Sequence, residues 1–360
     1  MAYISFQPID FFNTLNYVGT GSSQAITGVG FQPDFVWCKQ KDGGNSHMLA
    51  DAARGVNSKL SSNDTAGQNT GSTFLTAFGA DGFTGGGDYE INGNTANYVN
   101  WNWKGGTTSI PSGGSITPSA ANYSATSGFG AYVYTGTGSA GTIAHGLGKT
   151  PTAIIIKRYD SSGNSWAVYN VGFDTGGTAA ADYVMALNDS NAKSDDATYF
   201  NDTVPTSTLF SVGSANGVNG SGYTYVAYVF TSTAGFSKCG LYQGNGNADG
   251  TFVYTGFEPA FLIAKNRDSG GPASYGWTMM SNTFGMGGAT SSNPAYNDLT
   301  QNAYADQAVA VGSSPVCDFL SNGFKWRGTS VDSNQAAPFI YMAFARQSIV
   351  SSNSKAGTAR

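Results

Sequence analysis

The residues with the clearest capacity for chemistry are a lysine and an aspartate that recur three times with one spacing. Each lysine ends an apolar run, and an aspartate follows three residues later: Lys39 and Asp42, Lys157 and Asp160, Lys265 and Asp268. Three identical catalytic sites in one chain would be unusual, so we expect a structural role. The lysine would lie at the exposed end of a buried strand, and the aspartate would bond its own backbone where the loop begins.

Other groups that could support catalysis are few and scattered. His47 and His145 have no surrounding motif for a zinc site or a nucleophile system. Glycoside hydrolysis needs two carboxylates that face one cleft. Asp81, Asp88 and Glu90 are close in sequence, but their glycine-rich surroundings are typical of a solvated turn. The sequence therefore predicts no catalytic residue and no enzyme, and a carbohydrate-cleaving enzyme is the weakest alternative.

Two segments could be taken for cofactor sites. Gly146–Thr150 is similar to the end of a phosphate-binding loop, but Ile143 stands where the first glycine is needed, and Pro151 and a strand follow. Asn188–Asn191 and Asp195–Asp196 offer oxygen ligands without the regular spacing of a calcium loop. We expect no cofactor, and calcium binding by a loop stays open.

The lysines and aspartates belong to a longer set of landmarks that occurs three times in the same order. A Tyr-x-Gly-x-Gly turn comes first, a proline follows before the apolar run, and an aromatic run closes the set. The tyrosines, prolines and closing runs are Tyr17, Tyr134 and Tyr242; Pro33, Pro151 and Pro259; and Tyr98–Trp103, Tyr225–Phe230 and Phe339–Phe344.

These landmarks are typical of strands and tight turns. Proline marks a strand boundary because it cannot donate to a ladder, and the apolar run after it suits a buried central strand. The closing run alternates, with Val99, Trp101 and Trp103 on one side. The sequence thus predicts an all-β fold of three tandem β-sandwich or jelly-roll-like units, each of about 100–120 residues.

The predicted boundaries follow from composition. Repeat 1 covers residues 1–104, repeat 2 covers 129–231 and repeat 3 covers 235–347. Residues 105–128, rich in Gly, Ser, Thr and Pro, are the expected linker, and 348–360 the tail.

Charge and cysteine content exclude several classes of protein. Charged residues make up 11% of the chain, the net charge is −5, and no Lys/Arg cluster exists, so we expect neither nucleic-acid binding nor membrane insertion. Three separated cysteines, Cys38, Cys239 and Cys317, cannot form a disulfide framework, and Cys38 should be a buried free thiol. The N-terminus has no signal-peptide pattern. An extracellular type of composition without that signal fits a virus particle that leaves the cell by lysis.

Five segments of the first repeat carry a family resemblance. They are Phe6–Asn13, Ala25–Trp37, Asp51–Gly55, Ala80–Phe83 and Tyr98–Lys104. They resemble a repeated, lectin-like domain of virion structural proteins, including tail fibres, of marine and freshwater tailed phages. The resemblance is close over residues 1–104 and looser beyond, where Ile155 and Leu262 replace Trp37.

The resemblance implies a virion structural protein of a phage particle. We expect it at the particle surface, on the tail, where it would present loops for host recognition. The loops after Asp42, Asp160 and Asp268 are the expected recognition loops. Capsid decoration or a tail-wall assembly role is the alternative. Expected partners are other virion proteins and a host-surface glycan or protein. We also expect a homo-oligomer, with a trimer favoured, although three units in one chain could build a threefold body alone.

Overall fold

The computed structural model describes residues 6–270, 275–284, 298–299, 301–312 and 317–347; the predicted tail, 348–360, lies outside them. Strands dominate, which confirms the predicted all-β, sandwich-type fold. The helical elements described are η1 (Pro8–Asp10), η2 (Val171–Phe173), η3 (Ala180–Asp182) and α1 (Ala197–Phe200). Within the described residues, no helix is long and apolar enough to span a membrane.

Residues 7–104 form what we call the N-terminal assembly. Its main sheet has the order β1-β9-β3-β4, and a smaller sheet has the order β2-β8-β7. The strands are β1 (Phe12–Val18), β2 (Gln24–Thr27), β3 (Phe35–Gln40), β4 (Met48–Asp51), β5 (Ser58–Lys59), β6 (Asn69–Thr70), β7 (Leu75–Gly79), β8 (Gly82–Gly85) and β9 (Asn97–Trp103). A buried cluster that includes Ile26, Val36 and Phe83 fills the space between the two sheets.

Residues 105–231 form the central assembly. Its main sheet has the order β10-β11-β18-β13-β14-β15-β16, and β12 pairs with β17. The strands are β10 (Ala120–Ser124), β11 (Phe129–Thr135), β12 (Gly141–Ala144), β13 (Pro151–Arg158), β14 (Ala167–Asn170), β15 (Tyr183–Ala186), β16 (Ser194–Asp195), β17 (Leu209–Val212) and β18 (Thr224–Thr231). Strand β10 lies inside the predicted linker, so part of that segment belongs to the central sheet.

The described residues between 232 and 347 form the C-terminal assembly. Its main sheet has the order β19-β27-β21-β22-β24, and a second sheet has the order β20-β26-β25-β23. The strands are β19 (Ser237–Gln243), β20 (Phe252–Tyr254), β21 (Glu258–Asn266), β22 (Thr278–Ser281), β23 (Asp298–Leu299), β24 (Ala303–Tyr304), β25 (Cys317–Leu320), β26 (Gly323–Trp326) and β27 (Pro338–Gln347).

The repeated landmarks occupy equivalent places in the three main sheets. Each closing aromatic strand (β9, β18 or β27) lies between the strand with the Tyr-x-Gly turn (β1, β11 or β19) and the strand of the apolar run (β3, β13 or β21). A central position favours apolar side chains on both faces, and most of these runs supply them. In β9 one face instead carries buried Asn100 and Asn102, and Asn102 Nδ2 donates to Asn13 O (3.1 Å). Pro151 and Pro259 stand at the starts of β13 and β21, where the register shifts, because proline disrupts regular pairing.

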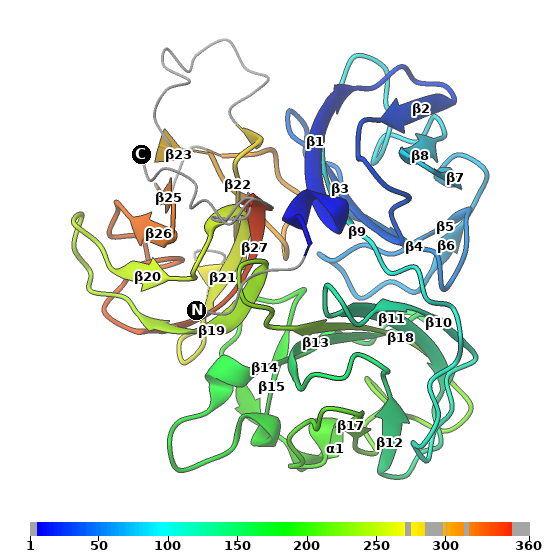
Figure 1. The fold of residues 1–360 in the computed structure, drawn as a ribbon, viewed down its shortest axis with the longest axis vertical. Coiled ribbons are helices and arrows are strands. Elements are labelled where there is room, and N and C mark those ends of the chain that lie inside the picture. Colours follow the sequence, from blue (N-terminus) through cyan, green and yellow to red (C-terminus); the bar gives the residue numbers. More distant parts are fainter. Residues whose placement is uncertain (1–5, 271–274, 285–297, 300, 313–316, 348–360) are drawn as a thin grey trace.

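The three main sheets meet at the centre of the molecule (Figure 1). Trp103, Phe230 and Phe344, at equivalent positions in the three closing strands, bring their rings into mutual contact. The ring centroids are 6.1 Å apart for Trp103 and Phe230, 5.4 Å for Trp103 and Phe344, and 5.7 Å for Phe230 and Phe344. All three pairs are edge-to-face, which is the favourable geometry for aromatic quadrupoles. One buried core therefore joins all three assemblies.

Hydrogen bonds across the seams close the assemblies into a ring. Trp166 Nε1 of the central assembly donates to Ser61 O (2.9 Å), and Trp277 Nε1 of the C-terminal assembly donates to Ala186 O (2.9 Å). His47 holds the equivalent position in the N-terminal assembly, and its Nε2 lies 2.9 Å from Tyr304 O. Its Nδ1 accepts from Trp37 Nε1, so Nε2 carries the proton and is the donor. Each assembly thus contacts the other two.

Replacing Phe230 with alanine should weaken the whole ring. Removing a buried phenylalanine ring costs about 3–5 kcal/mol. Because the core is continuous, we expect one unfolding transition, shifted as a unit, in urea denaturation followed by tryptophan fluorescence. The exposed Phe252→Ala is the matched control, with an expected change of about 1 kcal/mol or less. A Phe230→Ala transition that splits into separate steps would contradict a shared core.

Candidate functional site

The three repeated lysines are buried, so the expectation that they lie at exposed strand ends is wrong. Lys39, Lys157 and Lys265 each have 0% exposed area. Lys39 Nζ donates to the carbonyl of Gln40, the last residue of β3, and to those of Gly43 and Asn45 in the loop that follows. The ammonium is thus satisfied by backbone oxygens, as a buried charge requires.

The other two lysines reach across the seams. Lys157 Nζ donates to Thr65 O in the N-terminal assembly (3.1 Å) and to Asn164 O (2.5 Å). Lys265 Nζ donates to Ser190 O in the central assembly (3.0 Å) and to Asn266 O (3.0 Å). Burial lowers the pKa of all three ammonium groups to about 8. These lysines hold loops and seams together, and their Nζ atoms face backbone rather than a cleft.

The repeated aspartates tie the loop to the sheet, in two different ways. Asp42 Oδ2 accepts the backbone N–H of Asn97 (3.0 Å), and Asp160 Oδ2 accepts that of Thr224 (2.8 Å), so each holds the first residue of a closing strand. Asp268 instead accepts from Lys193 Nζ (2.7 Å) across a seam. These contacts all run to distant segments, and the predicted bond of each aspartate to its own backbone stays a prediction.

The repeated tyrosines lie under the turns that they precede. Tyr17, Tyr134 and Tyr242 donate through their hydroxyls to the carbonyls of Ile91, Val218 and Ser333. Each ring stacks on the first aromatic residue of the closing strand: Tyr98, Tyr225 and Phe339. Pro33, Pro151 and Pro259 are all buried. These positions maintain the fold.

The remaining sequence candidates do not converge on a site. Glu90 pairs with Lys59, and Asp81 accepts the backbone N–H groups of Gly28 and Gly30. Lys149 donates to Thr233 Oγ1, in a strand connection. Over the described ranges, no group of three His, Cys, Asp or Glu side chains could hold a metal ion. Cys38, Cys239 and Cys317 are free and buried, which confirms the prediction for Cys38.

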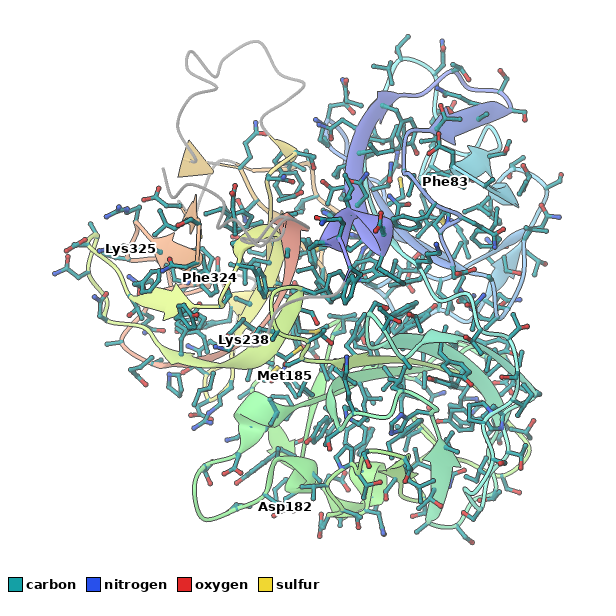
Figure 2. All side chains as sticks on the ribbon, viewed as in Figure 1. Phe83, Asp182, Met185, Lys238, Phe324 and Lys325 are labelled. Atoms are coloured by element: carbon teal, nitrogen blue, oxygen red, sulfur yellow. The ribbon has the colours of Figure 1, made fainter. Side chains whose placement is uncertain are left out.

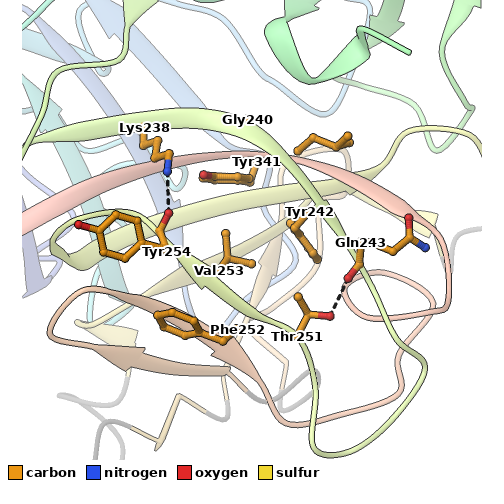
Figure 3. A pocket seen from close by; sticks show the side chains of 10 residues that line it. Lys238, Gly240, Tyr242, Gln243, Thr251, Phe252, Val253, Tyr254 and Tyr341 are labelled. Carbon is orange, nitrogen blue, oxygen red and sulfur yellow. Dashed lines mark hydrogen bonds between the residues drawn. The ribbon is translucent and has the colours of Figure 1, made fainter. Parts of the chain in front are cut away.

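An open groove lies on the outer side of the C-terminal assembly, between β19 and β20 (Figure 3). Its volume is about 440 Å³. Tyr242 and Tyr341 form the floor, supported by the buried ring of Phe324 on β26, whose place is shown in Figure 2. The remaining lining residues are Lys238, Gly240, Leu241, Gln243, Thr251, Phe252, Val253 and Tyr254.

Two hydrogen bonds close the ends of the groove (Figure 3). Lys238 Nζ donates to Tyr254 O (2.7 Å), and Thr251 Oγ1 donates to Gln243 O (2.6 Å). Between them Gly240 has no side chain, and a Cβ there would lie 3.2 Å from the Tyr341 ring. The equivalent residues are Leu15 on β1 and Tyr132 on β11. The groove is open because glycine stands where larger side chains fill the other assemblies.

The chemistry of the groove suits binding. Phe252 and Tyr254, both on β20, are 43% and 60% exposed, so aromatic surface at the groove faces solvent. None of the lining residues is an aspartate, glutamate or histidine. The groove therefore offers apolar contact area and a few polar groups, without paired carboxylates for acid–base chemistry.

Among the lining residues, the sequence analysis named Tyr242 and included Tyr341 in the closing run Phe339–Phe344, without predicting a groove. The signal that could have located the groove is Gly240. The equivalent positions of the other two repeats carry the larger residues Leu15 and Tyr132. Aligning the three repeats outward from Tyr17, Tyr134 and Tyr242 exposes this difference.

The lysine burial makes the stability of the ring depend on pH. The pKa of Lys157 is about 8 in the folded chain and 10.5 when unfolded. Between these values the unfolded lysine keeps a proton that the folded lysine has released, so the unfolding free energy rises with pH. From pH 7 to 9 we expect wild type to gain about 1 kcal/mol more than Lys157→Met, measured by urea denaturation. Between pH 6 and 7 both states hold the proton, and the two profiles should run parallel. Parallel profiles up to pH 9 would contradict a buried ammonium.

Comparison with known proteins gives a family. No curated protein sequence matches the chain. The model of a domain of unknown function, DUF7483, matches residues 7–348, which takes in all three assemblies and the groove. With nearly its whole length covered, the chain belongs to the DUF7483 family.

Proposed function

We propose that this chain is a non-enzymatic structural protein of a tailed-phage particle, acting as a tail-fibre or tail-associated adhesin. The observation that carries the proposal is the groove beside β19, where the aromatic side chains of Phe252 and Tyr254 are exposed. Rigid aromatic side chains give contact area at a low entropy cost. The resemblance of residues 1–104 to phage virion domains supports the assignment to a phage particle.

We place the proposed recognition surface at the groove and no longer at the three loops expected from the sequence. Directly before Asp42, the backbone contacts the C-terminal assembly, where Val311 N donates to Lys41 O (2.8 Å). In the loop after Asp160, Gly163 N donates to Thr65 O (3.0 Å), and near Asp268, Lys193 N donates to Arg267 O (2.9 Å). Backbone that is engaged in a seam is poorly placed to contact a host surface.

A second candidate function is passive assembly, as a capsid decoration or tail-wall protein. The open edges of β19 and β20 favour it, because sheet edges are common sites of protein association. The homotrimer stays a prediction; three equivalent seams within one chain already supply a threefold arrangement that a tail axis could use. An enzyme is the weakest candidate because acidic side chains are missing from the groove lining.

Immunogold electron microscopy of intact particles tests the proposal. Antibody raised against the whole chain should label the tail or its appendages, which identifies a tail protein and justifies a receptor search. Preadsorbing the antibody with purified protein is the control and should remove the gold. Label confined to the head would replace the adhesin with a decoration protein. Particles without label would refute both.

A further inference from the structure

The two strands that border the groove are both edge strands. In the part of the chain that the structure describes, β19 ends the main sheet of the C-terminal assembly and β20 ends its second sheet. An edge strand presents unpaired backbone groups that can accept another strand. Apart from Gln243 O and Tyr254 O, which accept side-chain hydrogen bonds, the groove is therefore bordered on two sides by strand edges that face no paired strand in the described residues.

The orientation of the β19 backbone can be read from one hydrogen bond. Cys239 N donates to Ser232 Oγ (3.0 Å) and so points away from β27. In an antiparallel pair the direction of the amide groups alternates from residue to residue. The N–H and C=O of Leu241, two residues on, consequently point away from β27 too, toward the open side.

In the central assembly the equivalent strand edge is occupied. Strand β10 pairs with β11 along its outer edge, with Ala120 opposite Val133. Val133 precedes Tyr134 as Leu241 precedes Tyr242, and its carbonyl accepts from Ser119 N (2.7 Å). The backbone position that is open at Leu241 is thus taken by an added strand at Val133.

The same covering segment also pairs with β12, the counterpart of β20. Ile116 forms a parallel bridge with Ile143, and its N–H donates to Thr142 O (2.9 Å). Ile116 is buried, and Tyr123 farther along stacks on Tyr132 with ring centroids 6.1 Å apart. Residues 115–124 therefore seal the side of the central sandwich as an extended peptide.

Chain length explains why the C-terminal groove stays open. Residues 104–128 separate β9 from β11 and supply the covering segment of the central assembly. Only residues 232–236 separate β18 from β19. A five-residue connection spans at most about 18 Å. The turn from β18 into β19 needs this whole length, so no residues remain to cover the groove. The C-terminal groove has no covering segment from the preceding connection.

We propose that the groove binds an extended peptide segment of a partner protein, which adds a strand to the edge of β19. The backbone of the segment pairs with Leu241, and an apolar side chain enters the space above Gly240, against Tyr341. Residues 115–124 in the central assembly are the template for this contact. The inference rests on the proposed binding function and names the class of partner.

Selection from a library of random 12-residue peptides on the immobilised full-length protein tests the proposal. Selected peptides, made synthetically with a fluorophore, are measured by fluorescence polarisation. We expect peptides with alternating apolar residues to be enriched. N-methylation of the amide that pairs with β19 should weaken binding at least tenfold, because it removes a backbone donor; a side-chain contact alone would be insensitive to it.

Variants locate the binding site. Gly240→Leu fills the groove with the side chain that Leu15 places in the N-terminal assembly, and it should weaken binding at least tenfold. The double variant Phe252→Ser and Tyr254→Ser tests the groove without touching the floor. Tyr89→Ser, 72% exposed on the N-terminal assembly, is the matched control and should bind as wild type does.

Several results would overturn the inference. One is that no peptide is selected above background. Another is that Gly240→Leu and the double variant bind the selected peptides as tightly as wild type does. A third is that N-methylated peptides bind as tightly as the unmodified ones. Saccharide binding that the double variant loses, with no peptide selected, would also overturn it. Tail labelling by immunogold without peptide selection would remove this inference and leave the proposed function standing. Peptide selection with no particle labelled would remove the proposed phage function and leave the peptide-binding groove standing.

Discussion

The aromatic rings of Trp103, Phe230 and Phe344 meet where the three main sheets converge, and the arrangement of every other element depends on this contact. Each ring is contributed by a strand that is central in its sheet. A closing strand cannot move without displacing the rings of both neighbours, because a close-packed interior leaves no room for independent motion. The central contact therefore couples the three assemblies.

Closing the ring determines which surfaces remain for function. The loops that follow Lys39, Lys157 and Lys265 contact neighbouring assemblies, and the lysines give up their hydration to backbone carbonyls. Polar residues that would signal an exposed site in an isolated domain act here as internal supports. The surfaces left are the outer sides of the sandwiches.

On those outer sides the repeats differ. In the central assembly residues 115–124 cover the edges of β11 and β12, whereas in the C-terminal assembly glycine at position 240 leaves an open, aromatic groove. In the N-terminal assembly Asn13 Nδ2 donates to Val29 O and Gln24 Nε2 to Val18 O across the corresponding opening. A common scaffold thus carries three different side openings, and function is expected where the repeats depart from one another.

The sequence alone determined the strands, the turns and their threefold recurrence, because proline, glycine and alternating apolar residues act through local backbone geometry. It also determined that Cys38 is buried and free, since Cys38 belongs to an apolar strand. The burial of Lys157 was decided by tertiary structure: its acceptor Thr65 lies 92 residues away. The same holds for the groove, although Tyr242 and Tyr341 both belong to the repeated sequence landmarks. Whether an edge strand is open depends on which distant segment reaches it. The composition of a segment predicts its flexibility but does not predict where it packs. Residues 105–128 have the composition of a linker, yet five of them became β10 because the edge of β11 was within reach.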